Sequence, residues 1–289
     1  MRRYDSTVAA FRYGLHDPTT RIASGEFWRA TFTPVGAGTV HLRWTDGSLT
    51  AEAWGDGAAW LLERVPAMTG QLDPGHEFRE AHPVVLAAQR RHGHLRIGAS
   101  GTLYHELLPV ILGQRITAGE AYQQWNRLVR ELGVAAPGPN TELLLPPAPA
   151  VLLGRPAWWY HRLGIEGRRA DALREVARHP QKLVEWSALP AADATQMVQL
   201  LPGIGAWTAA CAVGAAMGDP DAVAVGDFHL KNTVVHALTG RPRGTDEEML
   251  DVLQPYAGQR GRVVQWLLAD GHHAPAFGPR QRILPMNRW

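Results

Sequence analysis

The chain has 289 residues, of which 45% are hydrophobic and 19% are charged, a composition typical of a folded protein and not of a disordered one. At roughly 100–200 residues per domain, this length accommodates one large domain or two to three small ones. The 29 basic and 27 acidic residues leave a formal charge of +2, so only a local clustering of charge could point to a polyanionic partner.

The chain has a single cysteine, Cys211. One cysteine excludes an intramolecular disulfide, a cysteine-rich zinc site and a four-cysteine iron–sulfur cluster. The first residues include an acid, Asp5, and no apolar run follows, which argues against a signal peptide. The weakly apolar stretch 206–217 is too short to span a bilayer. We therefore expect a soluble cytoplasmic protein with no membrane contact.

Basic residues are almost all arginine: only Lys182 and Lys231 are lysine, against 27 arginines. The bias accompanies an abundance of Ala, Gly and Pro and is explained by composition alone. It nevertheless leaves few candidates for covalent chemistry through a lysine Schiff base.

The first third of the sequence has the pattern of strands. Segments 27–33, 39–44 and 49–54 alternate, and Asp46-Gly47 is a hairpin turn signal between the last two. Segment 58–65 then indicates a short helix. These features predict an α+β domain over residues 1–85, in which a small antiparallel sheet carries a helix on one face.

From Pro83 onward the apolar period is helical, which predicts a mainly α domain over residues 86–289. The amphipathic segments are 103–112, 118–130, 168–177 and 193–201, with a break at 113–117 and a proline-rich connector at 135–150. The aromatic run 158–160 is expected to pack in the core or between domains. The basic tail, 271–289, ends the chain.

The most informative stretch is 200–210, Leu-Leu-Pro-Gly-Ile-Gly-Ala-Trp-Thr-Ala-Ala. Pro202 cannot continue a helix, and Gly203 and Gly205 permit a tight turn before a new apolar helix near Ala206. The amides at that helix start would bind an anion, of which DNA phosphate is one. Two other interpretations are a turn that binds nothing and a dinucleotide-binding loop, although the latter requires a preceding strand.

A second feature is Asp227, which ends the apolar run 222–226 and precedes a helical pattern. Taken alone, it is best interpreted as a helix N-cap. The positive end of the helix dipole would stabilise its negative charge there.

Together, Leu200–Gly205 and Asp227 resemble the helix-hairpin-helix DNA glycosylase superfamily (HhH-GPD), which pairs a Leu-Pro-Gly-(Ile/Val)-Gly hairpin with an essential Asp about twenty residues later. Residues 205–209 and the pattern Asp227-Phe-x-x-Lys are similar to the alkylpurine branch, bacterial 3-methyladenine DNA glycosylase II. Segments 163–173 and 111–114 resemble an earlier helix and the loop that enters the DNA gap. The resemblance spans about residues 95–270.

The resemblance implies a two-lobed helical glycosylase core after the sheet domain, a monomer that acts on double-stranded DNA in the bacterial cytoplasm or nucleoid. Such an enzyme flips a nucleotide out of the duplex. The implied function is hydrolytic excision of damaged, alkylated purines resembling 3-methyladenine in base excision repair. Uracil, hypoxanthine or an oxidised base as the substrate, and a lesion-binding protein without activity, are the alternatives.

The family's functional residues map onto this sequence as follows. Asp227 is the expected catalytic carboxylate, which stabilises the sugar cation or orients the attacking water. The expected base pocket consists of Trp207, Cys211, Phe228 and Leu268. The expected DNA contacts are Gln114, Arg115, Pro202, Gly203, Ile204, Gly205, Thr208 and Lys231. The backbone carbonyls of Gln199, Leu201 and Ile204 are expected to hold Na⁺ or K⁺, with no other cofactor required.

The sequence departs from the family pattern at several of these positions. Arg115 stands where the branch has an apolar wedge, Cys211 replaces a Tyr, and no aromatic ring occurs at Leu268. Trp207 occupies the position of the lysine that forms a Schiff base in bifunctional relatives, which predicts a monofunctional hydrolase. The iron–sulfur cluster of the endonuclease III relatives is not expected with one cysteine.

Overall fold

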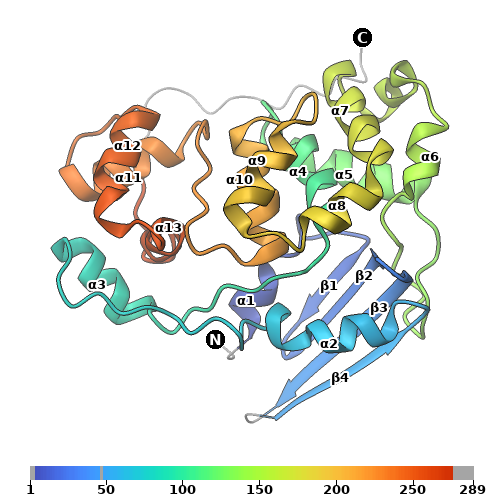
Figure 1. The fold of residues 1–289 in the computed structure, drawn as a ribbon, viewed down its shortest axis with the longest axis horizontal. Helices are drawn as coiled ribbons and strands as arrows, with labels where there is room; N and C mark the ends of the chain where they lie inside the picture. Colours follow the sequence, from blue (N-terminus) through green and yellow to red (C-terminus); the bar gives the residue numbers. More distant parts are fainter. Residues whose placement is uncertain (1–3, 46–47, 276–289) are drawn as a thin grey trace.

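A computed structural model describes residues 4–45 and 48–275 of the chain (Figure 1). The N-terminal part contains a four-stranded antiparallel sheet in the order β1-β2-β3-β4. Its elements are α1 (Asp5–Ala9), β1 (Thr20–Ala23), β2 (Glu26–Thr33), β3 (Gly36–Thr45), β4 (Ser48–Trp54) and α2 (Ala58–Met68). Helix α2 lies along the sheet (Figure 1).

The sheet forms because alternating side chains on β2 and β3 share one buried face. Phe27 is paired with Leu42, and both pack in a cluster with Leu61 and Met68 of α2. The three strands and the helix that alternation predicted are confirmed, with the helix extending to Met68. Strand β1 was not predicted. The predicted turn at Asp46-Gly47 lies outside the described residues.

The helical part begins at Pro83, where the apolar period changes, and it covers the rest of the described chain. Its elements are α3 (Pro83–His92), α4 (Leu103–Leu112), α5 (Ala118–Leu132), α6 (Pro149–Leu153), η1 (Ala157–Leu163), α7 (Gly167–Arg178), α8 (Pro180–Trp186), α9 (Ala191–Gln199), α10 (Ala206–Met217), α11 (Leu230–Thr239), α12 (Asp246–Leu253), η2 (Gln254–Tyr256) and α13 (Arg260–Ala269).

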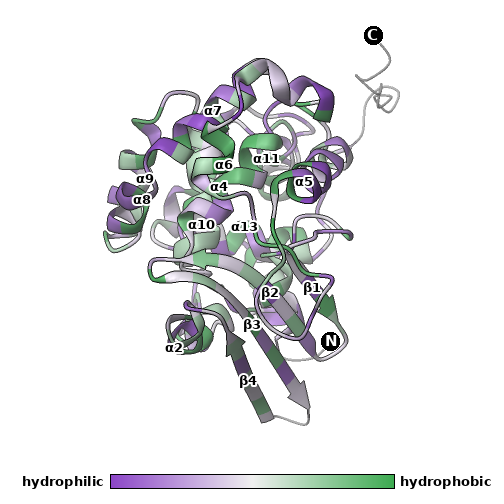
Figure 2. Ribbon diagram, turned by 90° about the vertical axis from the view of Figure 1, so that its right-hand side faces the viewer, coloured by the Kyte–Doolittle hydropathy of each residue, from purple (hydrophilic) through white to green (hydrophobic). Residues whose placement is uncertain are grey.

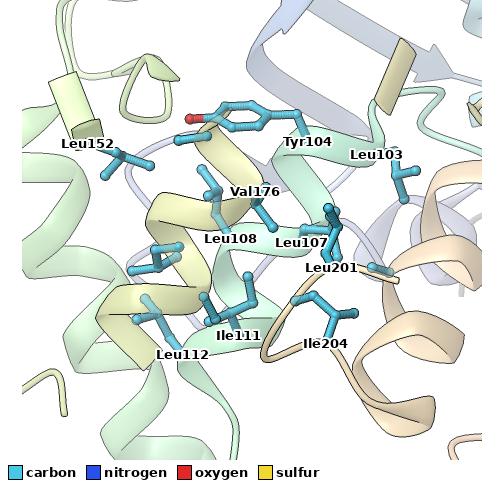
Figure 3. Close-up of a cluster of buried hydrophobic side chains, with 14 of the residues drawn as sticks. Leu103, Tyr104, Leu107, Leu108, Ile111, Leu112, Leu152, Val176, Leu201 and Ile204 are labelled. Atoms are coloured by element: carbon cyan, nitrogen blue, oxygen red, sulfur yellow. The ribbon is translucent and has the colours of Figure 1, made fainter. Parts of the chain in front are cut away.

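Helix α4 is the centre of the larger helical lobe, since every residue in it except Val110 is buried. It packs against α10, α7, α5 and α8. Figure 3 shows that side chains from α4, from Val176 of α7 and from the turn after α9 point into one apolar cluster. Hydrophilic residues lie along the outer helices α8 and α9 (Figure 2).

The second lobe consists of α3 and α11–α13, drawn at the left of Figure 1, and it has a separate hydrophobic cluster. Helix α3 precedes α4 in the chain, yet Val85 and Ala88 of α3 pack in this second cluster. The predicted domain boundary at residue 85 therefore falls inside a helix that belongs to the second lobe. None of the helices in the described part of the chain is long and apolar enough to cross a membrane.

A buried ion pair ties the second lobe to the segment that follows α2. Arg262 of α13 is 1% exposed, and its two Nη atoms donate to the carboxylate of Asp73 at 3.0 and 2.6 Å. The same carboxylate accepts the amides of Ile97 and Gly75. Asp73 thus joins three segments that are remote in sequence.

The expected packing of all three residues in the aromatic run 158–160 is wrong for one of them. Trp158 is 73% exposed, whereas Tyr160 is fully buried. The run lies in η1, a 3-10 helix with three residues per turn. Tyr160 and Leu163 therefore share the buried face, and Trp158 faces outward.

Candidate active site

The turn between α9 and α10 is held by its apolar residues. Leu201 and Ile204 are buried in the main cluster (Figure 3), and the Ile204 amide donates to the Leu201 carbonyl at 3.0 Å. Gly203 has a φ of +87°, and a Cβ there would lie 2.8 Å from the Cβ of Ala172 on α7. Only glycine fits this position, because the backbone is left-handed and the helix lies close.

Gly205 has a different role, since a Cβ there would meet nothing within 4 Å. Gly205 and Ala206 are exposed, and α10 starts without a side-chain cap. The first amides of a helix lack partners within the helix, so the start of α10 presents donors to solvent. Helix α9 precedes the turn, in the place where a dinucleotide-binding loop requires a strand.

The loop after α4 lies directly against this turn. The Gln114 Nε2 donates to the Gly203 carbonyl at 3.0 Å and to the Thr208 Oγ1 at 2.9 Å. Arg115 is exposed and has a φ of +59°, the one positive φ outside glycine in the described ranges. A left-handed φ at a non-glycine residue costs about 1 kcal/mol or more, which marks this loop as strained. Arg169 donates to the Leu112 carbonyl at 2.9 Å and so fixes the start of the loop.

Asp227 is held by three N–H donors. Its Oδ1 accepts the amides of His229 and Leu230, each at 2.8 Å, at the start of α11. Its Oδ2 lies 3.3 Å from the Trp207 Nε1, on the first turn of α10. The Asp227 carboxylate therefore caps the start of α11, as the sequence indicated, and it also contacts the hairpin helix α10. Asp227 remains partly exposed.

Behind Trp207 lies a cavity of about 220 Å³ where the N-terminal segment, β2, α4 and α10 meet. It is lined by Ala10, Phe11, Tyr13, Asp17, Arg29, His105, Glu106, Pro109, Val110, Trp207, Cys211 and Ala215. Burial, followed by the negative charge of Asp227, raises the pKa of the Cys211 thiol to about 12. Cys211 is therefore a neutral thiol at physiological pH and not a nucleophilic thiolate.

Two of the four residues predicted for the base pocket, Trp207 and Cys211, line this cavity. Phe228 does not line it; this residue is 75% exposed and its ring lies edge-on to His229. Leu268 does not line it either and is 44% exposed on α13.

Most of the predicted DNA contacts are grouped at the hairpin. Pro202, Gly203 and Gly205 are exposed there, whereas Ile204 and Thr208 are buried. Lys231 is held elsewhere, since its Nζ lies 3.0 Å from the Asp246 Oδ2. The other oxygen of Asp246 accepts the amide of Gly226, so this ion pair braces the loop that carries Asp227.

The charged residues of the cavity were not found from sequence. Arg29 of β2 and Glu106 of α4 form an ion pair at 2.5 Å, with side chains only 1% and 7% exposed. Both residues are charged, although their neighbours on the same face or in the same segment are apolar. Arg29 lies on the inward face of β2 with Phe27. Glu106 lies within the apolar segment 103–112. Opposite charges at two buried positions were the available signal, because buried charges occur in pairs.

No protein-family model matches this chain, and no curated protein matches it. Several solved structures, in contrast, match this chain over most of its length. A 3-methyladenine DNA glycosylase from Archaeoglobus fulgidus matches with a TM-score of 0.75 and 17% identity over 93% of this chain and 94% of its own. An 8-oxoguanine glycosylase/lyase from Clostridium acetobutylicum, in complex with DNA, matches with a TM-score of 0.66 and 14% identity over 89% and 88%.

A third match is the 3-methyladenine DNA glycosylase of Schizosaccharomyces pombe bound to abasic DNA, with a TM-score of 0.50 and 16% identity over 74% of this chain and 90% of its own. These three proteins share an architecture with this chain, and sequence identities of 14–17% support a common fold only. The mainly α fold with an N-terminal antiparallel sheet is confirmed, and the chain has the fold of the helix-hairpin-helix DNA glycosylases.

Proposed function

We propose that this protein is a DNA glycosylase that hydrolyses the bond between a damaged purine and its deoxyribose. One observation carries the proposal. The Oδ2 of Asp227 lies 3.3 Å from the Nε1 of Trp207. Trp207 is on α10, the helix that begins at the open turn at Gly205. A site for phosphate, at the start of α10, and an anion for sugar chemistry, the Asp227 carboxylate, therefore lie next to each other at the first turn of α10. The structural neighbours named as DNA glycosylases support the same interpretation.

The reaction that fits this geometry breaks the C1′–N bond, and its electron pair leaves with the base. The sugar becomes an oxocarbenium-like cation, which a fixed carboxylate stabilises. Three N–H donors hold Asp227, so the anion needs little reorganisation as the cation develops. A water oxygen then bonds to C1′, and its proton passes to Asp227 or to solvent. The products are a free base and an abasic site.

We propose alkylated purines as the substrates, with 3-methyladenine as the model lesion. A base alkylated on a ring nitrogen is already cationic and leaves without a strong general acid. The Trp207 ring would attract such a base by roughly 0.5–2 kcal/mol. Among the structural neighbours, two are named 3-methyladenine DNA glycosylases and one is named an 8-oxoguanine glycosylase/lyase, so they are compatible with both substrate classes and the choice of alkylated purines rests on Trp207.

The hairpin glycines separate DNA binding from folding in a matched pair of variants. Gly205→Val places a side chain over the exposed amides without backbone strain, since Gly205 has a φ of −95°. We expect about a tenfold loss of affinity for duplex DNA, the effect of one lost charge-assisted hydrogen bond, with little change in stability. Gly203→Ala should instead lower the free energy of unfolding by about 1–3 kcal/mol, because its φ is +87° and Ala172 is close.

Fluorescence anisotropy and thermal unfolding measure the two effects. Equal loss of stability in both variants, with unchanged DNA affinity in Gly205→Val, would refute a phosphate site at this turn.

The Na⁺ or K⁺ ion on the carbonyls of Gln199, Leu201 and Ile204 stays a prediction, as does the monomeric state.

A duplex assay tests the activity. Oligonucleotides that contain 3-methyladenine, hypoxanthine, uracil or 8-oxoguanine are incubated with the protein, and each sample is divided before alkali treatment. We expect alkali-dependent breaks at alkylated purines and intact strands without alkali, since Trp207 replaces the Schiff-base lysine. Breaks without alkali would contradict a monofunctional enzyme, and binding without cleavage would indicate a lesion-binding protein.

A further inference from the structure

Trp158 is an exposed tryptophan that the proposed excision chemistry does not use. It is 73% exposed and lies in η1, which joins α6 to α7 at the right of Figure 1. Within the described part of the chain its indole makes no ring contact and no cation–π contact. Trp159 beside it is also partly exposed, so two indoles are open to solvent at one place. Apolar surface of this size left in water indicates a site for a partner.

The second indole, Trp159, is held in place and carries two cations. The guanidinium carbons of Arg155 and Arg162 lie 5.3 and 4.5 Å from the centre of its ring, within the range of cation–π attraction. The ring lies edge-on to Tyr160, which is fully buried and whose hydroxyl donates to the Leu152 carbonyl at 2.8 Å. The buried tyrosine therefore orients Trp159, and the indole in turn positions the two guanidinium groups.

Positive charge accompanies the indoles over the whole length of η1. Residues 154–165 contain two arginines, one histidine and no acid. Arg127 of α5 extends this charge to the end of η1, since its Nη1 would lie 3.8 Å from a Cβ placed on Gly164. The seven residues of η1 rise by about 2.0 Å each, so the charged surface spans roughly 14 Å, the length of a few nucleotides. We call this surface the η1 strip, and it consists of Arg127, Arg155, Trp158, Trp159 and Arg162.

The arginines of the η1 strip are available to an anion. Among the described residues, Arg127 and Arg155 form no ion pair, and Arg162 pairs with Glu131 of α5. The side chains of that pair are 53% and 42% exposed, and exposed pairs contribute little to stability. A phosphate can therefore replace Glu131 as the partner of Arg162 at small cost, because a guanidinium matches the geometry of phosphate.

A short chain of hydrogen bonds links the η1 strip to the loop beside the hairpin. The Gly164 carbonyl, at the end of η1, accepts the Gln124 Nε2 at 2.6 Å. The Gln124 Oε1 accepts the Arg169 Nη1 at 2.7 Å, and the same Nη1 donates to the Leu112 carbonyl. Leu112 precedes the loop whose Gln114 contacts the hairpin. Two side chains thus separate the end of the strip from the proposed DNA site.

We propose that the η1 strip binds an unpaired segment of a DNA strand, with a base stacked on Trp158 and phosphates on the arginines. Bases inside a duplex are stacked on one another, so only an unpaired strand offers a free base face to an exposed indole. An acidic protein would also satisfy the arginines, but the link to the hairpin favours a strand that continues from the bound duplex. That link rests on the proposed function, whereas the chemistry of the strip does not.

Binding of a single strand is measured on the intact protein by fluorescence anisotropy, with a labelled thymidine oligonucleotide of about 12 nucleotides. Trp158→Ala should weaken binding at least about fivefold, the effect of one lost base stack. Trp158→Phe should retain most of the affinity, because a phenyl ring still stacks. Equal affinities of wild type and Trp158→Ala would overturn the proposal, and so would the absence of binding to wild type.

Trp60→Ala is the matched control. Trp60 lies on α2, is partly exposed, and has the guanidinium carbon of Arg64 4.6 Å from the centre of its ring. It therefore repeats the contact between tryptophan and arginine outside the η1 strip. The affinity for the oligonucleotide should be unchanged in this variant, and thermal unfolding checks that each variant is folded. A loss as large as in Trp158→Ala would overturn the proposal, since the binding would not be specific to the strip.

A polyanion without bases separates stacking from charge. Linear polyphosphate with about the same number of charges as the oligonucleotide should bind wild type and Trp158→Ala equally, because only the arginines contact it. Arg155→Gln should weaken binding of both polyanions and make the slope of log K against log salt for the oligonucleotide shallower by about 0.7. Equal losses of both polyanions in Trp158→Ala would contradict base stacking.

The variants of the hairpin and of the strip distinguish the two sites. Gly205→Val should weaken binding of duplex DNA and spare the thymidine oligonucleotide, whereas Trp158→Ala should do the reverse. Loss of the oligonucleotide in Gly205→Val but not in Trp158→Ala would overturn the proposal, since the single strand would then occupy the hairpin.

The two proposals fail in different ways. Binding of the oligonucleotide that depends on Trp158, by a protein that excises no base from any duplex, would sustain the η1 strip and reject the glycosylase function. Excision of damaged bases by a protein that binds no single strand would reject the η1 strip alone.

Discussion

Asp227→Asn is expected to reduce the rate of base excision under single-turnover conditions by about 10²- to 10⁴-fold. This range covers the loss of a fixed charge or of a general base at a reacting centre. The variant should remain folded, because the amide oxygen can still accept the amides of His229 and Leu230 at the start of α11. The affinity for duplex DNA should change little, since the hairpin donors are unaltered.

Asp251→Asn is the matched control for this variant. Asp251 is an exposed carboxylate on α12, in the same lobe as Asp227. The control removes the same charge from the second lobe and should leave the excision rate unchanged. Equal rates of base excision for wild type and Asp227→Asn would show that the carboxylate takes no part in catalysis, whatever the result for Asp251→Asn.

Asp73→Ala is expected to lower the free energy of unfolding by about 3–5 kcal/mol, the cost of leaving a buried ion-pair partner uncompensated. Arg262 is 1% exposed, and without Asp73 its two Nη atoms lose the carboxylate oxygens to which they donate. The variant also removes the acceptor for the amides of Ile97 and Gly75. Chemical denaturation measures the change.

Glu142→Ala provides the contrast, because its ion pair with Arg21 is exposed, at 76% and 57%. Exposed pairs contribute about 0–1 kcal/mol, so this variant should be nearly neutral. Similar losses in both variants would mean that burial does not set the importance of the Asp73 pair.

The same pair predicts a dependence of stability on pH. The hydrogen bonds from Arg262, Ile97 and Gly75 hold the pKa of Asp73 below its usual value of 3.8, despite burial. A carboxyl group with a lowered folded pKa contributes its full stability above the unfolded pKa and loses it as pH falls through the folded value. The difference in stability between wild type and Asp73→Ala should therefore shrink below about pH 4.

Much of the fold could be predicted because local signals and packing agree. Strands β2 and β3 alternate in sequence, and the alternate residues Phe27, Val40 and Leu42 are buried in the cluster that includes α2. Strand β1 has only four residues, too few for a period of two to be distinguished from a loop. Trp158 was expected to pack in the core or between domains as part of an aromatic run, whereas the geometry of the 3-10 helix decides which face it occupies.

The site was predictable where its residues are close in sequence and not where the fold assembles them. Trp207 and Asp227 are twenty residues apart and both belong to a recognisable pattern. Tyr13, Arg29 and Glu106 come from remote segments, and only the tertiary structure brings them to one cavity. Lys231 was assigned to DNA by position, but a local partner, Asp246, holds its ammonium group.

The most direct test of the account follows the oxygen atom. Alkylated duplex DNA is incubated with the protein in water enriched in ¹⁸O, and the products are analysed by mass spectrometry after immediate reduction of the sugar with borohydride, which prevents oxygen exchange. We predict that the alkylated base is released as the free base and that the reduced abasic sugar carries ¹⁸O at C1′, and that Asp227→Asn forms both products at least about 100-fold more slowly. Release of a nucleoside or nucleotide, or ¹⁸O on phosphate, would contradict the account, since the bond broken would then be a phosphodiester.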